Sequence, residues 1–198
     1  MLLIDGSQML QDPSKRRYWN FEFVVPQSDY KLPSWFINQS STASITIKSD
    51  PNRANSELIG VAMVFCFRAN SSMEDDFWCE IRDDSGKYWT MALDVEHSRT
   101  SDHLFLHYNS CENVFKTELD THGLSLLTSL DMDTHGFSLP TSWDTLEFSF
   151  FSARDKRCSS CEPCGVRLVY EEDIKELKEI TNKYINDQKD VQSSHSQR

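Results

Sequence analysis

Hydrophobic and polar residues alternate with a period of two along most of the chain, which is the pattern of half-buried β-strands. The longest apolar segment, residues 58–69 (LIGVAMVFCFRA), is rich in Val, Ile and Phe, so it predicts the central strand of a sheet. Its odd positions, from Ile59 to Phe67, are bulky, and its even positions, from Gly60 to Cys66, are small or medium. We expect the bulky face to fill a core and the other face to accept a close contact with another element.

Shorter alternating segments precede and follow this strand, with turn residues between them. They cover residues 21–25, 44–48, 77–82, 88–93, 103–108, 145–152 and 165–170. Residues 83–87 (DDSGK) form a strong turn signal, so the strands on either side predict a hairpin. Because no clear amphipathic helix precedes residue 171, the pattern predicts an all-β fold, an antiparallel two-sheet β-sandwich.

A short internal duplication interrupts this pattern. The heptapeptide at residues 120–126 (DTHGLSL) recurs at 133–139 (DTHGFSL). Two copies are too few for a repeat array, so we expect a lengthened loop or hairpin with apolar residues at its tip. Such loops are where function tends to be carried. We call residues 120–143 the duplicated loop.

The end of the chain follows a different period. Ile174, Leu177, Ile180 and Tyr184 form a rough helical stripe among charged residues, and a Gln- and Ser-rich stretch follows. We therefore expect a short C-terminal helix and a disordered tail. The predicted organisation is a lead-in at 1–19, a β-sandwich domain at 20–171 and a charged tail at 172–198.

The overall charge limits the classes of partner. The 198 residues carry 20 Lys and Arg against 31 Asp and Glu, a formal net charge of -11. This balance argues against binding to nucleic acid or to an anionic membrane surface. No apolar window approaches the roughly 18 residues of a membrane span, and the start lacks the features of a signal peptide. We expect a cytoplasmic or nuclear location with reduced thiols.

The sharpest metal-like signal is a cysteine cluster. Cys158, Cys161 and Cys164 form two successive CxxC spacings. A tetrahedral zinc site needs a fourth ligand, and no Cys or His follows at the expected distance. We expect ordinary reduced thiols and no metal, and we keep zinc and a redox-labile disulfide as alternatives.

Other candidate chemistry is weaker. His103 and His107 are spaced as a helical metal pair, but on a strand they lie too far apart to chelate, so we expect surface or half-buried histidines. No nucleophile elbow, phosphate-binding loop or dinucleotide fingerprint is present. The sequence thus predicts no catalytic residue and no cofactor. Sugar binding by exposed aromatic rings is a further alternative, carried by Trp35, Trp78, Trp89 and Trp143.

Five motifs, taken in order, resemble one family. They are LPSWF at 32–36, SITIK at 44–48, IGVA at 59–62, HLFLHY at 103–108 and CGVRLVY at 164–170. Over residues 20–171 this set resembles the C-terminal jelly-roll/Ig-like domain of plant TIR-type nucleotide-binding leucine-rich-repeat (TIR-NB-LRR) disease resistance proteins. This domain is also called the post-LRR domain or C-JID. Three features depart from the family. Pro26 is followed by Gln27 where Gly is usual, the duplicated loop looks like an insertion, and Cys158 and Cys161 add to the single family cysteine at 164.

The resemblance implies a binding module of an intracellular immune receptor. Such a domain caps the last leucine-rich repeat and, with that array, binds a pathogen effector protein through its loops. Binding lets the receptor oligomerise, and its TIR domains then hydrolyse NAD+. The TIR and nucleotide-binding modules are absent from this sequence, so we expect no enzyme activity here. The alternatives are a structural, autoinhibitory cap of the repeats and a thiol- or zinc-dependent enzyme.

The resemblance also divides the residues by role. It implies core and turn roles for the recurrent motif positions, which are Trp35, Phe36, Gly60, Leu104, Leu106, Cys164, Gly165 and Tyr170. Ligand contacts should lie in loops that do not match the family. Our candidates for partner binding are His122, Leu124, His135, Phe137 and Trp143 in the duplicated loop, because exposed aromatic and apolar residues make good interface anchors. The alternative is that Leu124 and Phe137 pack this loop onto the sandwich.

Overall fold

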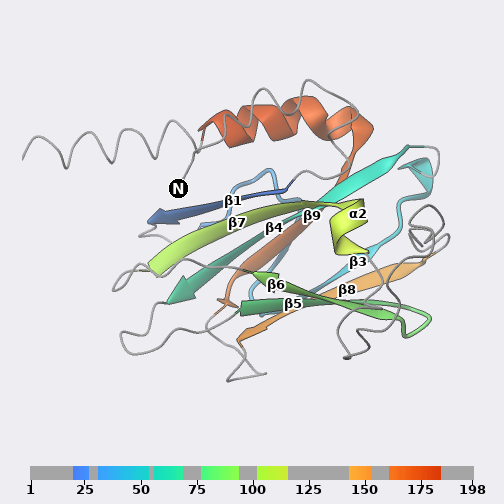
Figure 1. Cartoon of the computed structure of the whole chain (residues 1–198), viewed down its shortest axis with the longest axis horizontal. Coiled ribbons are helices and arrows are strands. Elements are labelled where there is room, and N and C mark those ends of the chain that lie inside the picture. Colours follow the sequence, from blue (N-terminus) through green and yellow to red (C-terminus); the bar gives the residue numbers. More distant parts are fainter. Residues whose placement is uncertain are drawn as a thin grey trace, which may run out of the picture.

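Two antiparallel sheets form the body of the molecule. The computed structural model describes residues 20–26, 31–53, 56–68, 77–93, 102–115, 143–152 and 161–183. One sheet has five strands in the order β1-β7-β4-β9-β2, and the other has four in the order β3-β8-β5-β6 (Figure 1). All the paired strands are antiparallel. The predicted two-sheet β-sandwich is therefore confirmed.

The strands lie close to where the alternating pattern places them. Their bounds are β1 Asn20–Pro26, β2 Asn38–Ser40, β3 Ser44–Lys48, β4 Leu58–Arg68, β5 Phe77–Asp83, β6 Tyr88–Leu93, β7 Asp102–Ser110, β8 Thr145–Ser152 and β9 Cys164–Tyr170. The long apolar segment is β4, the middle strand of its sheet. The pattern missed the short strand β2 and a one-turn helix, α2 (Cys111–Val114).

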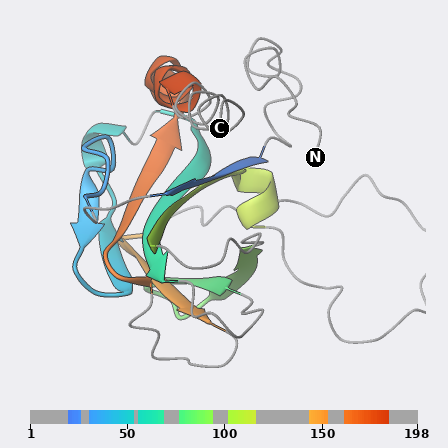
Figure 2. The ribbon, with the colours of Figure 1, turned by 90° about the vertical axis from the view of Figure 1, so that its left-hand side faces the viewer.

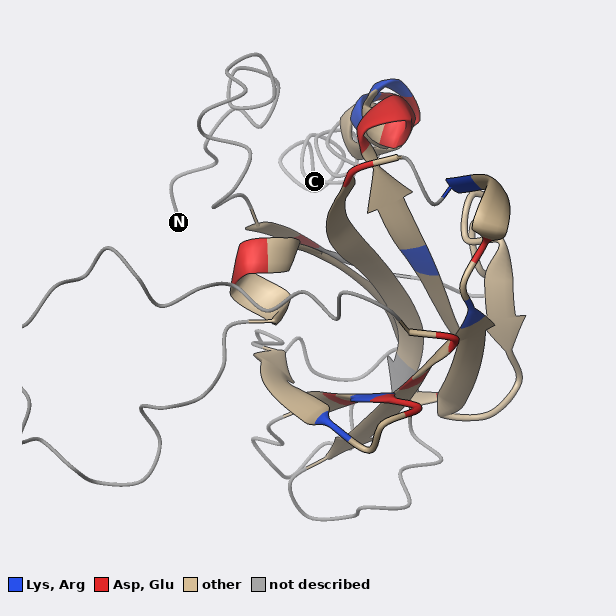
Figure 3. Cartoon of the chain, turned by 90° about the vertical axis from the view of Figure 1, so that its right-hand side faces the viewer, with Lys and Arg blue, Asp and Glu red and all other residues tan. Residues whose placement is uncertain are grey.

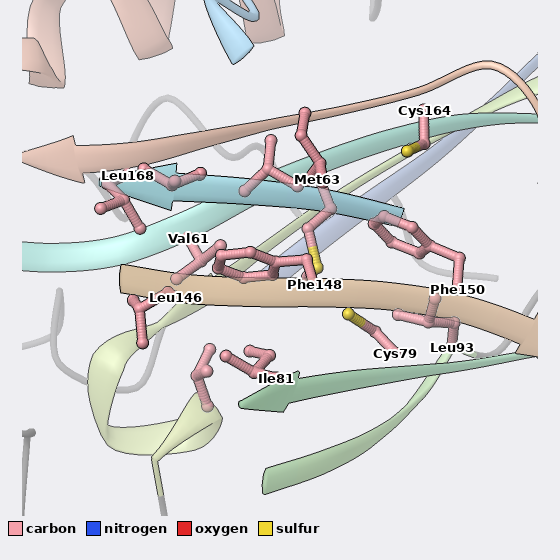
Figure 4. Close-up of a cluster of buried hydrophobic side chains, with 14 of the residues drawn as sticks. Val61, Met63, Cys79, Ile81, Leu93, Leu146, Phe148, Phe150, Cys164 and Leu168 are labelled. Atoms are coloured by element: carbon pink, nitrogen blue, oxygen red, sulfur yellow. The ribbon is translucent and has the colours of Figure 1, made fainter. Parts of the chain in front are cut away.

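The main core fills the space between the sheets. Bulky side chains of β4 and β9 meet those of β5, β6 and β8, as the labelled residues of Figure 4 show. Val61, Met63 and Phe65 supply the odd positions of β4, and none of the three is exposed to solvent. Because strands turn alternate side chains to opposite faces, this is the face on which the bulky residues were expected.

The opposite face of the five-stranded sheet is covered by the chain itself. Ala62, Val64 and Cys66 belong to a second buried cluster with Phe36 and Leu177. Leu177 lies on the C-terminal helix, whose described part spans residues 174–183 and which lies above this sheet, away from the other one (Figure 2). The expected close contact on the small-residue face is thus present, and its partners are the 32–36 segment and the helix.

One position of β4 departs from the alternation. Ile59 was expected on the bulky face with Val61, but it packs with the second cluster. The reason is a register shift between Leu58 and Gly60 in the pairing with β9. A bulge of this kind turns two successive residues to the same side.

Gly60 lies in this bulge under a tight contact. A Cβ atom at this position would lie 2.5 Å from the carbonyl oxygen of Asn109 and 2.6 Å from Cε2 of Tyr108, and it would also meet the Tyr108 hydroxyl. Only glycine fits here without a backbone shift.

Candidate protein-interaction surface

The described chain stops at Phe115 and resumes at Trp143, before and after the duplicated loop, and both points lie at one end of the four-stranded sheet. On the side where the chain leaves, Phe115 is fully buried and packs edge-on against Trp89 of β6, with ring centroids 5.1 Å apart. On the side where it returns, the backbone N–H of Asp144 donates to Asp84 Oδ1 at 3.2 Å, and its carbonyl accepts from Ser49 N at 2.9 Å. Both roots are therefore held beside the β5–β6 hairpin.

The hairpin turn is held by several hydrogen bonds. Asp83 N donates to the carbonyl of Lys87 at 2.9 Å, and Gly86 N donates to the carbonyl of Asp83 at 3.1 Å. The Asp83 carboxylate also accepts from Ser85 Oγ at 2.7 Å and from Lys87 N at 2.9 Å. Gly86 has a φ of 84°, which only glycine adopts without strain. This bonding fixes the hairpin turn to which Asp144 is bound.

Exposed side chains beside this turn suit contact with a protein. Tyr88 is 63% exposed, and the Lys87 ammonium lies 4.9 Å from the centre of the Trp89 ring. Tyrosine offers a large rigid surface with one polar group, a combination enriched at protein interfaces. The hairpin end of the sheet can therefore take part in a binding surface with the duplicated loop.

The outer face of the four-stranded sheet carries two further rows of side chains. Phe151, Trp78 and Ala92 lie opposite one another on β8, β5 and β6, and the two aromatic residues are half-buried. Nearer the hairpin, Arg82 lies opposite Glu147 and Tyr88 and binds Glu80 at 2.8 Å. Within the described ranges no helix covers this face, whereas the outer face of the five-stranded sheet is covered.

The structure locates only one of the five residues predicted to bind a partner. His122, Leu124, His135 and Phe137 lie outside the described residues. Trp143 is half-buried and packs against the main core. Part of its side chain is thus engaged within the protein.

The motif residues of the family pattern lie in the interior. Phe36 and Cys164 have no exposed surface, Leu106 has 1%, and Leu104 and Tyr170 are also buried. Gly165 lies in β9 against Phe36 and Val64. A Cβ atom at this position would lie 3.0 Å from a side-chain carbon of Val64 and 3.1 Å from one of Phe36, which is a tight contact. Trp35 is half-buried, stacks edge-on against Phe36 at 5.0 Å and lies under the guanidinium of Arg167 at 4.5 Å.

The cysteines of the described chain are buried. Burial raises the pKa of the Cys164 thiol to about 12, with a further contribution from Glu162, and Cys164 Sγ donates to the carbonyl of Thr42 at 3.1 Å. Cys161 is also buried, and Cys158 lies outside the described residues. Within the described ranges, no three His, Cys, Asp or Glu side chains gather in a way that could hold a metal ion. A thiol with so high a pKa is a poor nucleophile at neutral pH.

The two histidines on β7 are more buried than expected. His103 is 3% exposed and His107 is 6% exposed, so the prediction of surface or half-buried side chains was wrong. The reason is that β7 is an inner strand, flanked by β1 and β4. His107 Nε2 lies 2.8 Å from Asn109 Nδ2, and its Nδ1 lies 3.7 Å from a carboxylate oxygen of Glu22.

Sequence reasoning missed a buried ionic network that ties the C-terminal helix to the sheet. Asp173, in the 3-10 turn Glu171–Asp173 that precedes the helix, accepts from Arg167 Nη2 and Arg53 Nη1, each at 2.7 Å, and from Tyr170 N at 3.0 Å. Burial raises the pKa of Asp173, but the hydrogen bonds from Arg53, Tyr170 and Arg167 outweigh it, so the pKa is lowered. A signal was present, because an arginine inside the apolar strand CGVRLVY needs a buried partner.

The described fold defines a class, namely an antiparallel two-sheet β-sandwich. The C-JID domain family matches residues 28–175, so the chain belongs to this family, the post-LRR domain of TIR-NB-LRR plant resistance proteins. The comparison with curated proteins gave no match. Among the described residues, no helix is both long and apolar enough to cross a lipid bilayer.

Proposed function

We propose that this domain takes part in recognising a pathogen effector protein for an intracellular plant immune receptor. The observation that carries the proposal is that the described chain before and after the duplicated loop, at Phe115 and Asp144, is held beside the β5–β6 hairpin. A loop fixed at both roots loses less conformational freedom on binding than a free one, so more of the contact energy is available for affinity. Exposed Tyr88 lies beside the same roots.

In this proposal the domain acts together with its neighbours in the receptor. The adjacent leucine-rich repeats supply a second part of the binding surface. Effector binding leads to oligomerisation, and the TIR domains of the assembled receptor hydrolyse NAD+. The domain itself contributes no catalysis and no cofactor, and the receptor acts in the cytoplasm or the nucleus.

A binding titration tests the proposal. A panel of purified secreted proteins, from a pathogen that the parent receptor resists, is titrated against the chain and against a Leu124→Ala/Phe137→Ala variant. Ile37→Ala is the matched control, because Ile37 is 72% exposed and lies beside β2, on the sheet edge opposite β1. Circular dichroism establishes that each variant is folded.

The expected result is binding by the wild type and the control and its loss in the double variant. Equal binding by the wild type, the double variant and the control would show that the duplicated loop does not bind the effector. Binding by no panel member would favour the alternative of a cap that shields the end of the repeats. That outcome would be checked on protein that includes the repeats.

A further inference from the structure

Of the described edge strands, β6 alone is long enough to pair with another chain and carries no residue that blocks pairing. The edge strands are β1, β2, β3 and β6. β1 carries Glu22 and ends at Pro26, β2 has only 3 residues, and β3 carries Lys48. Charges, proline and short length are the usual means of blocking a sheet edge. The 6 residues of β6, YWTMAL, include no charge, no proline and no glycine.

The hydrogen-bond pattern shows which residues of β6 face the free edge, the edge with which no described strand pairs. Asp83 N bonds to the carbonyl of Lys87, so this pair is a hydrogen-bonded one at the start of the β5–β6 ladder. Hydrogen-bonded and non-hydrogen-bonded pairs alternate along an antiparallel ladder. Trp89, Met91 and Leu93 therefore direct their backbone groups to β5, opposite Ile81, Cys79 and Phe77. The backbone groups of Tyr88, Thr90 and Ala92 point away from β5.

The side chains of these edge-facing residues leave room for an incoming strand. Tyr88 and Ala92 are exposed and Thr90 is half-buried. Ala92 is small and lies opposite Trp78 of β5, so a partner side chain that pairs with Ala92 reaches the neighbourhood of the Trp78 ring. An apolar or aromatic residue fits best at that place, because it extends the row of Phe151, Trp78 and Ala92.

Charge selects between the possible occupants of this edge. The chain has a formal net charge of -11, so two copies repel each other when their edges approach. β6 itself adds no charge, and the turn before it carries Asp83 and Asp84 against the single cation Lys87. The occupant that fits is therefore a neutral or basic segment of another protein.

We propose that the free edge of β6 docks an extended, neutral or basic segment of a partner protein, which becomes a fifth strand of the four-stranded sheet. This mode of recognition uses main-chain hydrogen bonds for affinity and alternate side chains for specificity. The inference deepens the proposed function and rests on it for the identity of the partner, since the edge lies beside the roots of the duplicated loop.

The test uses a variant that removes one edge hydrogen bond and leaves the ladder with β5 intact. Thr90→Pro deletes the N–H that points to the free edge, a place where an edge strand tolerates proline. Thr90→Val is the matched control, because it keeps the backbone donor and changes only the side chain. Ala92→Lys is a second edge variant, since Ala92 is exposed and a lysine there blocks pairing without entering the core.

The probe is a displayed library of random peptides of about ten residues, near the upper end of usual strand length. Peptides enriched on the wild-type chain are synthesised and titrated against each folded variant. We expect enriched peptides that are neutral or basic, with Thr90→Pro and Ala92→Lys each weakening their binding by about tenfold or more and Thr90→Val by less than about twofold. If Thr90→Pro does not fold, Ala92→Lys decides.

Three results would overturn the inference. They are an absence of enriched peptides, equal binding of the enriched peptides to the edge variants, and light scattering that shows a dimer of the wild type lost in Thr90→Pro. The last result would assign the edge to a second copy of the chain. The panel of secreted proteins tests the proposed function separately, so a panel member that binds wild type and Thr90→Pro equally refutes the edge and leaves the function standing.

Discussion

Asp173 joins the C-terminal segment to the five-stranded sheet, and replacing it by Asn tests how far this network holds the helix in place. Asn keeps one acceptor oxygen but presents an amide N–H₂ to an arginine that now donates to a carboxylate. The Asp173 and Arg167 side chains are 5% and 9% exposed, so water does not replace the lost bond. Arg167 retains the carboxylate of Glu176, at 2.8 Å and on a side chain that is 58% exposed, and its Nη1 still donates to the carbonyl of Trp35 at 3.1 Å.

The expected cost follows from this geometry. Removing one partner of a buried ion pair costs about 3–5 kcal/mol, and the remaining bond to Glu176 favours the lower value, about 3 kcal/mol. For a chain of this size, a loss of about 3 kcal/mol lowers the midpoint of thermal unfolding by about 6–12 °C. Glu176→Gln is the control and should cost less than about 1 kcal/mol, because the Glu176 side chain is largely exposed.

The effect should depend on pH in a defined direction. The pKa of Asp173 is lowered in the folded protein, so its stabilisation is complete above the unfolded pKa of about 3.9 and is lost as the pH falls through the folded pKa. Urea unfolding followed by tryptophan fluorescence, at neutral pH and below about pH 4, measures the difference between the wild type and Asp173→Asn. A cost below about 1 kcal/mol at neutral pH, or one that does not shrink on acidification, would refute this reasoning.

Further substitutions test the packing. Gly60→Ala should cost about 3 kcal/mol in the free energy of unfolding, because its Cβ meets backbone, and Gly165→Ala about 1 kcal/mol, because its neighbours need to move less; equal costs would contradict the clash at Gly60. Leu177→Ala should cost about 3 kcal/mol because its side chain is fully buried, whereas Ile37→Ala should change stability by less than about 0.5 kcal/mol in the same denaturant titration. Cys164, with its pKa raised to about 12, should react with a thiol reagent much more slowly in the native chain than in urea, as followed by peptide mass spectrometry. Similar rates in both states would show an accessible thiolate.

The strands were predictable because their signal is local. In β3 the alternation of Ile45 and Ile47 with polar residues appears directly as a buried and exposed pattern. The hairpin between β5 and β6 is specified by its own turn, where Gly86 takes the φ that the turn requires. Each of these elements is determined by neighbours a few residues away, which a sequence displays.

Other features depend on residues far apart in the chain. The bulge at Ile59 arises in the pairing with β9, and the Tyr108 hydroxyl donates to the Ile59 carbonyl at 3.3 Å, from 49 positions away. The three polar residues of β2 form a strand because their backbone pairs with β9. Local alternation contains no information on either pairing.

The candidate surface was predictable only in part. The duplication drew attention to the loop, but the contacts on either side of it do not follow from local sequence. Asp144 bonds to Asp84, which is 60 positions away, and Phe115 packs against Trp89 of β6. The C-terminal helix again shows both cases. Its charged residues were evident from the sequence and are visible in Figure 3. The ion pair between Asp173, in the turn before the helix, and Arg53 was not evident, because the two residues are 120 positions apart in the chain.

The most direct test of the proposed function is an exchange of the duplicated loop, residues 120–143, between the parent receptor and a related receptor that detects a different pathogen. Both hybrids are expressed in leaves at levels matched to the wild types, and cell death is scored after delivery of each pathogen. The account predicts that the pathogen detected changes with the loop. Hybrids that accumulate normally and keep the original pathogen range would contradict it.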